Sequence, residues 1–365
     1  MYIKKVFIFL LVIVMVFGII GCTVNQSEEA IDKDIGKATT RTIEDMAGRT
    51  VTIPTNVNKV YSTNSIGTIF LYTLAPDKIA GWNNELGSDK QYIKEEYHNL
   101  PVLGRWKGPN SLSIEEILKV QPDIIINMGD VNEKYIAESD EIQELFGIPV
   151  IMVDGSLTMQ DEAYQFLGDI LGVESRALEL ADYSKNIIED IEVKAGLISD
   201  EEKTQVYYAA GIKGIETVPT GSINTEVLDF VGGQNIASLG SSKDVRRMEV
   251  SLEQIIGWNP ELIIISPDSS DNHEAYNSIL KDKAWSNIAA VQNKEVYEIP
   301  YGPYDWFNRP PSVMRLMGLQ WLGNLLYPDI YQIDLETETK NFFDLFFDHQ
   351  LSDNDVKQIL ERSVR

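Results

Sequence analysis

The sequence predicts an α/β protein made of two similar lobes, each with a mostly parallel sheet, joined by a single long interlobe helix. The main observation is a stretch that occurs twice, at 113–126 and at 251–264. When Glu115 is aligned on Glu253, six of the 14 paired positions are identical. A second observation is a run with helical spacing at 174–195, between the two copies. A repeat at this separation predicts two related lobes rather than a short solenoid repeat.

Each copy of the repeat predicts a helix followed by a buried strand. Ser113 or Ser251 opens the copy, and a Glu or Gln three residues later completes a capping-box pattern at a helix start. Pro122 or Pro260 then ends the helix, because proline cannot donate the backbone hydrogen bond that a helix interior needs. The apolar run that follows is typical of a parallel strand buried on both faces.

The other predicted elements alternate between strands and helices. Residues 42–54 predict a β-hairpin with Ala47 and Gly48 in its turn. Further strands are predicted at 60–62, 79–82, 150–153, 206–209 and 296–300, and further helices at 66–74, 226–231, 313–326, 336–347 and 353–360. Asn64 and Trp82 follow or end predicted strands, at the carboxyl edge where open α/β sheets hold ligands, so both are candidate binding residues.

Composition excludes some classes of function. The formal charge of −25 argues against a nucleic-acid partner, because an acidic surface repels phosphate backbones. The single cysteine, Cys22, cannot form an intramolecular disulfide and offers no cysteine cluster for zinc. With 365 residues, of which 44% are hydrophobic, the chain can hold two domains with substantial cores.

The N-terminal segment predicts export. Lys4 and Lys5 precede an apolar run at 6–20, and Gly21 stands before Cys22. This pattern resembles the lipobox of bacterial lipoproteins, which implies that Cys22 is acylated and becomes the first residue of the mature chain. The apolar run is short for a membrane-spanning helix.

The predicted organisation has five parts. They are a signal peptide at 1–21, a flexible polar tether at 22–40, an N-terminal lobe at 41–158, an interlobe helical connection at 159–197, and a C-terminal lobe with terminal helices at 198–365. The tether is predicted from its polar composition, which offers too little apolar surface to fold.

Arginines precede both copies of the repeat. Arg105 stands eight residues before Ser113, and Arg246 and Arg247 stand five and four residues before Ser251. A guanidinium binds carboxylate, hydroxamate, catecholate or oxoanion oxygens through a planar fork, so these arginines are candidate ligand contacts. The alternative is that they pair with the many surface carboxylates.

Aromatic residues provide the other candidate contacts. The stretch 301–309 combines four aromatic residues with an arginine after a predicted strand. Tyr301, Tyr304, Trp306 and Arg309 could form a flat wall for a chelate that is apolar outside and charged at its centre. The alternative is that these aromatic residues pack the core. Trp106 and Tyr208 are further candidates, since they also lie near predicted strand ends.

Enzyme and metal signatures are missing from the sequence. It contains no G-x-S-x-G, no G-x-x-x-x-G-K-[ST] and no H-E-x-x-H motif, and its three histidines are far apart in the chain. We therefore predict no catalytic residues, no metal site and no cofactor.

Several motifs together resemble one family. They are the lipobox, the opening D-M-A-G-R-T-V-T-I-P at 45–54, the doubled S-[IL]-E-[EQ]-I and P-[DE]-[IL]-I-I pattern, and L-D-F-V-G-G-Q-N-I-A at 228–237. The chain resembles the solute-binding lipoproteins of ABC importers, in the class that serves ferric siderophores, haem and cobalamin. The resemblance covers about residues 41–362.

The resemblance implies a function for the whole chain. It implies a monomeric receptor, lipid-anchored on the extracytoplasmic face of the membrane, which delivers a small ligand to an ABC permease. It also implies that Glu115 and Glu253 pair with arginines of the permease, although each acid could instead complement its helix dipole. A ferric siderophore or similar metal chelate is the first expectation for the ligand. Cobalamin, haem and an oxoanion such as molybdate stay open, as does an exported α/β enzyme.

Overall fold

The two copies of the repeat form the same helix-and-strand unit in the computed structural model, which describes residues 39–108, 111–237, 247–266 and 273–365. Helices α2 (Ile114–Val120) and α7 (Leu252–Trp258) start after a serine whose hydroxyl accepts a hydrogen bond from a backbone N–H three residues on. In these two helices the serine half of the predicted capping box forms, whereas the return hydrogen bond from the serine N–H to Glu116 or Gln254 does not. Each helix ends at a left-handed residue, Gln121 or Asn259, with φ of 49° and 50°.

The first copy contributes to a parallel sheet of three strands in the order β3-β4-β5. Its strands are β3 (Val60–Ser62), β4 (Ile124–Gly129) and β5 (Val150–Asp154). Every residue of β4 is buried, as the apolar run predicted. Helices α1 (Ser65–Leu74) and α3 (Glu133–Phe146) belong to the same half.

The predicted N-terminal hairpin is confirmed. Strands β1 (Thr40–Glu44) and β2 (Thr50–Pro54) pair antiparallel, and Gly48 in the turn has a φ of 76°, which glycine adopts without steric cost. Asp45 attaches the hairpin to the sheet, because its Oδ2 accepts a hydrogen bond from the N–H of Met152 at 2.9 Å.

The second copy contributes to a parallel sheet of four strands in the order β11-β10-β6-β8. These strands are β6 (Gln205–Ala209), β8 (Gln234–Asn235), β10 (Leu262–Ile265) and β11 (Val296–Glu298). A short antiparallel pair, β7 (Glu216–Thr217) and β9 (Met248–Glu249), follows the end of β6. The same half holds α6 (Glu226–Phe230), α8 (Glu274–Lys281) and α9 (Ala289–Gln292).

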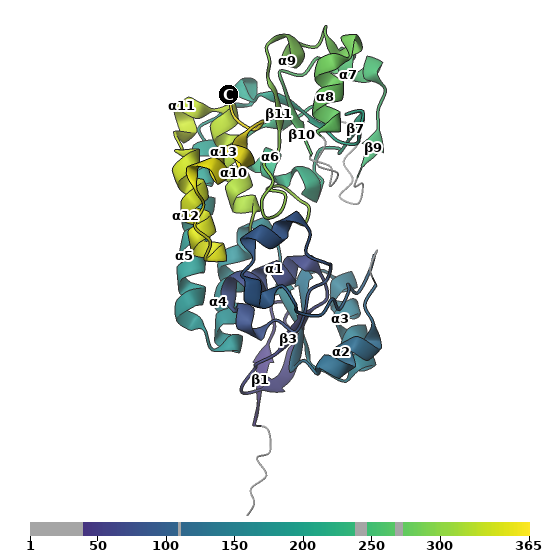
Figure 1. The fold of residues 1–365 in the computed structure, drawn as a ribbon, viewed down its shortest axis with the longest axis vertical. Coiled ribbons are helices and arrows are strands. Elements are labelled where there is room, and N and C mark those ends of the chain that lie inside the picture. The colour runs from purple at the N-terminus through teal and green to yellow at the C-terminus, as the bar shows by residue number, and fades with distance from the viewer. Residues whose placement is uncertain (1–38, 109–110, 238–246, 267–272) are drawn as a thin grey trace, which may run out of the picture. The chain divides into compact units, whose positions relative to one another are not determined.

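Helices connect the two sheets (Figure 1). The predicted long helix is α5 (Glu174–Ala195), which follows α4 (Gln160–Leu171) and spans 22 residues. The chain ends with α10 (Arg315–Leu326), α11 (Pro328–Tyr331), α12 (Leu335–Phe347) and α13 (Asp353–Leu360). One hydrophobic cluster contains residues of both sheets, such as Ile126 and Ile264, so the two halves share a continuous core.

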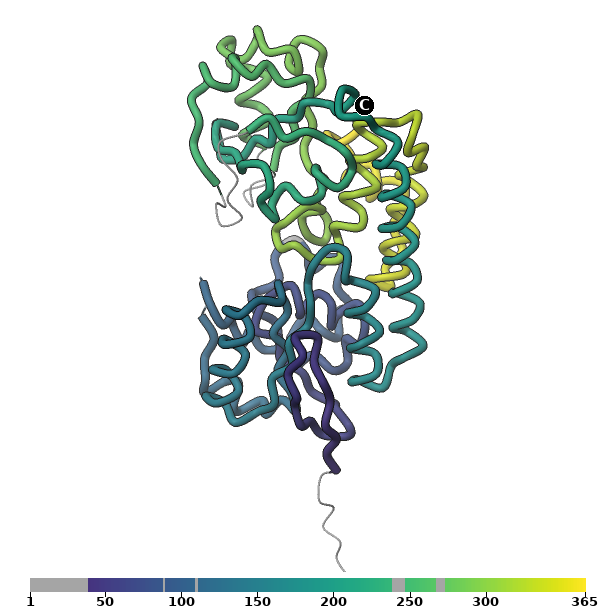
Figure 2. Tube along the Cα trace, turned by 180° about the vertical axis from the view of Figure 1, so that it is seen from behind, coloured from purple at the N-terminus to yellow at the C-terminus, as the bar shows by residue number. Residues whose placement is uncertain are grey.

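Helix α12 reinforces the connection that α5 makes. Its phenylalanines pack on both α5 and the first half of the chain, with ring centroids of Tyr183 and Phe342 6.1 Å apart and those of Tyr72 and Phe347 6.0 Å apart. The tube view shows α5 and the C-terminal helices along the same side of the molecule (Figure 2). The predicted long connecting helix is therefore confirmed as α5, and α12 packs against it.

The predicted strand at 79–82 does not form. Ile79 makes one bridge to Val60, and Trp82 makes one bridge to Val102. Because the segment crosses from one neighbour to another within four residues, it never runs beside either of them long enough to form a ladder.

Candidate ligand-binding site

The loop containing Arg105 and Trp106 is fixed at the carboxyl end of β3. The N–H of Trp106 donates to the carbonyl of Thr63, which follows β3, at 2.8 Å. The carbonyl of Gly104 accepts hydrogen bonds from the hydroxyl of Tyr61 at 3.0 Å and from Asn83 Nδ2 at 2.8 Å. These bonds hold the loop at the edge of the first sheet where ligands bind in open α/β folds.

Trp106 has a donor without a partner. Its side chain is half-buried against the cluster that contains Tyr61 and Ile117, yet its Nε1 is shielded from water and meets no acceptor among the described residues. An indole nitrogen can only donate, and leaving such a donor buried and unpaired costs about 1–3 kcal/mol. The side chain of Arg105 is also half-buried in the same loop.

Arg247 occupies the corresponding edge of the second sheet. It directly precedes β9, and β9 pairs with β7, which is bridged to Ala210 at the end of β6. Its Nη1 lies 3.6 Å from Glu216 Oε2, which is a loose ion pair. Its Nη2 is buried and has no partner among the described residues. Arg246, the neighbouring candidate, lies outside the described residues.

The first part of the aromatic stretch contacts the other half of the chain. Tyr301 is 40% exposed, and its hydroxyl donates to Asp89 Oδ1 at 3.0 Å. Burial raises the pKa of Asp89 to about 6, although the hydrogen bond from Tyr301 opposes the shift. Tyr304 is half-buried and packs against the shared core. Tyr301 therefore keeps an accessible face, as a pocket wall requires.

Three other predicted contacts are core residues. Trp306 is fully buried and its Nε1 donates to the carbonyl of Gly302 at 3.0 Å. Trp82 is 3% exposed and its Nε1 donates to the carbonyl of Tyr97 at 2.9 Å. Tyr208 is 1% exposed and stacks on Phe307. For these residues the packing alternative is correct, because their polar atoms have partners and their rings have no free face.

Asn64 has a structural role in the loop after β3. Its Oδ1 accepts a hydrogen bond from the N–H of Gly67 at 3.1 Å and so caps α1. Its Nδ2 donates to the carbonyl of Met128 at 2.7 Å. Both ends of the amide are therefore used by the backbone, which leaves little hydrogen-bonding capacity for a ligand.

Asp305 is a polar residue that the sequence analysis did not single out. It is 1% exposed, and its Oδ1 accepts hydrogen bonds from the N–H groups of Phe307 and Asn308 at 2.7 and 2.8 Å. Its Oδ2 has no partner among the described residues. Burial raises the pKa of this carboxyl, while these N–H groups and the charge of the exposed Arg309 oppose the shift. Arg309 thus lies near a buried carboxyl beside the second sheet.

Arg315 joins the two halves and was also missed. It is 1% exposed, and its Nη1 donates to Glu226 Oε2 at 2.6 Å while its Nη2 donates to the carbonyl of Gly155 at 2.8 Å. Gly155 follows β5 of the first sheet, and Glu226 begins α6 of the second half. Burial lowers the pKa of Arg315, and the carboxylates of Glu226 and Asp130 oppose that shift.

The matching acids Glu115 and Glu253 point into solvent. Each is the second residue of its helix and is exposed. Neither forms an ion pair with a described residue, whereas neighbouring Glu116 lies 3.6 Å from Lys119. Two free carboxylates at equivalent positions are available to an external partner.

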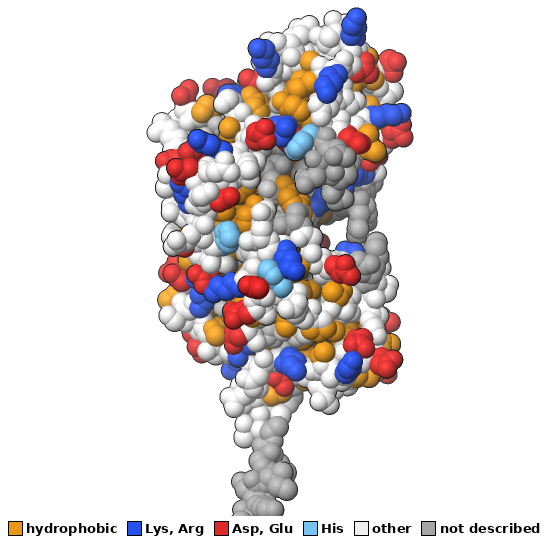
Figure 3. Space-filling model, viewed as in Figure 1, with side chains coloured by type: hydrophobic (Ala, Val, Ile, Leu, Met, Phe, Trp, Pro, Cys, Tyr) orange, Lys and Arg blue, Asp and Glu red, His pale blue; other side chains and the backbone are white. Residues whose placement is uncertain are grey.

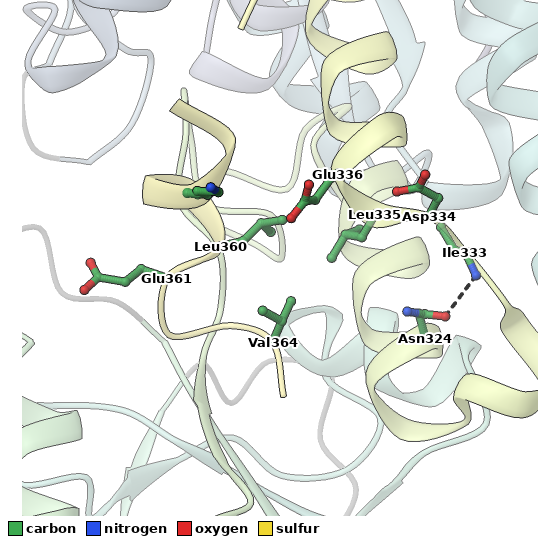
Figure 4. Close-up of a pocket in the computed structure, with 9 residues that line it drawn as sticks. Asn324, Ile333, Asp334, Leu335, Glu336, Leu360, Glu361 and Val364 are labelled. Carbon is green, nitrogen blue, oxygen red and sulfur yellow. Dashed lines mark hydrogen bonds between the residues drawn. The ribbon is translucent and has the colours of Figure 1, made fainter. Parts of the chain in front are cut away.

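A separate cavity lies between the C-terminal helices (Figure 4). It has a volume of about 460 Å³ and is lined by residues of α10, α12 and α13, including Asp334, Glu336 and Glu361. Hydrogen bonds from Thr337 lower the pKa of Asp334, so this carboxylate is ionised at neutral pH. Its lining has three carboxylates and one cation, Lys357, which does not favour an anion, and the predicted contacts are not among its lining residues.

The described residues contain no group of three His, Cys, Asp or Glu side chains that could hold a metal ion. The donors at the sheet edges are instead N–H groups of Trp106 and Arg247, which suit an anion. In the space-filling view the surface is open between the two halves, on the side away from α5 (Figure 3).

Comparison with known proteins agrees with this architecture. Residues 70–301 match the family model described as periplasmic binding protein. The molybdate-binding protein MolA of Haemophilus influenzae is 25% identical over 337 residues, which cover 84% of this chain and 91% of MolA. A vitamin B12-binding protein of Vibrio campbellii is 27% identical over 236 residues, which cover 62% of this chain and 75% of that protein.

A solved structure of an ABC-transporter solute-binding protein has the same fold. The solute-binding protein of an ABC transporter from Sulfurospirillum deleyianum superposes with a TM-score of 0.80 at 30% identity, covering 88% of this chain and 99% of that one. The fold, with its two parallel sheets and connecting helices, defines an extracytoplasmic substrate-binding protein of an ABC importer. The chain belongs to the periplasmic binding protein family, in the class that includes binders of siderophores, vitamin B12 and molybdate.

Proposed function

We propose that the ligand of this chain is an oxygen-rich metal anion, a class that includes ferric siderophores and oxoanions such as molybdate. The observation that carries this proposal is that two of the buried donors without a partner among the described residues, Trp106 Nε1 and Arg247 Nη2, lie at sheet edges. Each lies at the carboxyl edge of a parallel sheet, one in each half of the chain. An oxygen-bearing ligand would give both donors the acceptors that the described residues do not provide.

The relatives support a metal-containing ligand without selecting one. MolA is named for molybdate, and the Vibrio protein is named for vitamin B12, which contains cobalt. The family assignment also favours a receptor over the exported enzyme that the sequence left open.

A panel of ligands tests this proposal directly. Native mass spectrometry of the purified protein with molybdate, a ferric catecholate siderophore, cobalamin and haem should show stoichiometric binding of molybdate or of the siderophore. Binding of cobalamin or haem alone would contradict the anion proposal and leave the receptor class intact.

Removing the donors should weaken binding of the ligand that the panel identifies. Arg247→Ala is expected to lower affinity by roughly ten- to hundredfold, since a hydrogen bond to a charged group contributes about 1.5–3 kcal/mol. Arg247→Lys should recover only part of this loss, because an ammonium cannot copy the planar fork. Trp106→Phe removes the N–H and keeps most of the aromatic ring, so a loss of affinity in this variant measures the contribution of the hydrogen bond. Titration calorimetry measures all three variants.

A matched control is Arg365→Ala, which removes an arginine that pairs with Glu295 near the chain end. Its affinity should equal that of the wild type. Unchanged affinity in Arg247→Ala and in Arg105→Ala would place the ligand elsewhere.

We also propose that the mature protein is anchored by lipid at Cys22, which lies outside the described residues. None of the helices in the part of the chain that the structure describes is both long and apolar enough to cross a bilayer. Cys22→Ser removes the thiol that would be acylated, so it should release the protein from the membrane fraction into the medium or periplasm. Labelling of cells with radioactive palmitate checks the prediction: wild type should carry label and the variant none, and an unlabelled wild type would refute the anchor.

A further inference from the structure

Exposed aliphatic side chains accompany the two matching acids. Leu118 on α2 is 46% exposed and Ile256 on α7 is 40% exposed. In the alignment that pairs Glu115 with Glu253, these two residues also occupy equivalent positions. Residues three apart on a helix are neighbours on its surface, so each acid has a large apolar side chain beside it.

Packing of the core does not explain the aliphatic side chains of Leu118 and Ile256. Ile117 and Ile255 are the residues that anchor the two helices, and both are fully buried. The next position along each helix turns away from the core, where a polar residue would be expected in a surface helix. Ile114, four residues before Leu118, is also 43% exposed, which enlarges the apolar surface of α2.

The two helices lie on the same side of the molecule. In the ribbon view α2 and α7 lie on the side away from α5 (Figure 1), and the colours of the tube view, seen from behind, agree (Figure 2). Hydrophobic side chains reach the surface in the region of α2 (Figure 3). A partner that approaches from this side meets the same combination twice, a free carboxylate with an aliphatic side chain next to it.

We infer that Leu118 and Ile256 are apolar docking contacts for the permease, each entering a hydrophobic pocket next to the basic group that receives Glu115 or Glu253. This inference rests on a further proposal, that the chain delivers its ligand to an ABC permease and that Glu115 and Glu253 pair with basic groups of that permease, as the family resemblance implies. The two exposed carboxylates are complementary to a basic protein surface. Because they occupy equivalent positions in the two copies of the repeat, they fit a partner that presents two equivalent pockets. The carboxylates set orientation and encounter rate, while burial of the aliphatic groups adds affinity that salt does not screen.

The test measures docking of full-length protein to its cognate permease–ATPase complex in nanodiscs. Leu118→Gln/Ile256→Gln should weaken docking by about tenfold, as expected for losing two partly buried aliphatic contacts, and should leave the thermal unfolding midpoint unchanged. Each single variant should account for a similar share of the loss. The matched control is Leu178→Gln/Val193→Gln on α5, whose residues are 54% and 69% exposed; it should dock like wild type.

Salt dependence separates the two kinds of contact. The loss caused by Leu118→Gln/Ile256→Gln should be the same at low and high ionic strength. The loss caused by Glu115→Gln/Glu253→Gln should shrink as salt rises, because salt already screens the wild-type ion pairs.

Other outcomes decide against the inference. If Leu118→Gln/Ile256→Gln docks normally while Glu115→Gln/Glu253→Gln does not, the apolar contacts are refuted and the proposed function stands. If neither variant weakens docking, both the apolar contacts and the carboxylate docking role are refuted. Equal weakening by the α5 control would show a non-specific surface effect and would also overturn the inference.

Discussion

Replacing Glu115 and Glu253 together by Gln is expected to abolish ligand uptake in cells that carry the cognate transporter. Both carboxylates are exposed, and neither pairs with a described residue, so no ion pair within the described part of the chain depends on their charge. The helix-dipole contribution of each is only about 0.3–1 kcal/mol, and Gln keeps the size of the side chain. Ligand affinity and unfolding temperature should therefore remain close to those of the wild type while transport of radiolabelled ligand is lost.

The adjacent residue offers a control for this variant. Glu116→Gln removes a neighbouring acid that lies 3.6 Å from Lys119, and it should transport normally. Normal transport by the double variant, or loss of its ligand binding, would refute the docking role and leave the dipole or a pocket role to explain these acids.

Glu226→Ala is expected to destabilise the fold by about 3–5 kcal/mol, because it leaves the guanidinium of Arg315 buried without its closest counter-ion. Arg315 is 1% exposed, whereas the side chain of Glu226 is 37% exposed. Arg315→Met should therefore cost less than Glu226→Ala, since the carboxylate left behind can be hydrated and no charge remains in the core. Urea unfolding of both variants measures this difference.

The attraction of Asp130 for Arg315 sets the lower end of the expected range, because it partly replaces the lost carboxylate. A control is Glu189→Ala on α5, which removes an exposed partner of Lys185 at 3.8 Å and should change stability by no more than about 0.5 kcal/mol. If Arg315→Met proves more destabilising than Glu226→Ala, the carbonyl of Gly155 rather than the ion pair is the main contribution of Arg315.

Sequence patterns predicted the helices and strands well where the periodicity was strong. The repeat, the hairpin and α5 were all predicted close to their observed bounds. Helix α3 was missed because its sequence is mostly polar, with Ile142 and Phe146 among its few buried apolar side chains. Its ends carried usable signals, since Asn132 caps the helix and Gly147 ends it in the left-handed region.

The site was harder to predict, because local sequence does not show which neighbour is buried. Tyr301 keeps an exposed face while Trp306, five residues on, is fully buried. That difference depends on how the stretch packs against α10 and the opposite half, which composition does not reveal. Arg315 could have been found, since it is the single charged residue in the run at 313–326, which is otherwise uncharged and mostly apolar.

Helix α12 is synthesised long after the first sheet, yet it completes the core of the first half of the molecule. Tyr72, Tyr92 and Tyr164 of the first half are covered by Phe347, Phe343 and Phe346, with ring centroids 5.3–6.1 Å apart. On a growing chain these faces stay uncovered until α12, residues 335–347, has been made. Until then they are open apolar surface, of the kind that binds chaperones or other chains. The first sheet can form early, but the core of its half of the molecule is completed only when α12 packs on it.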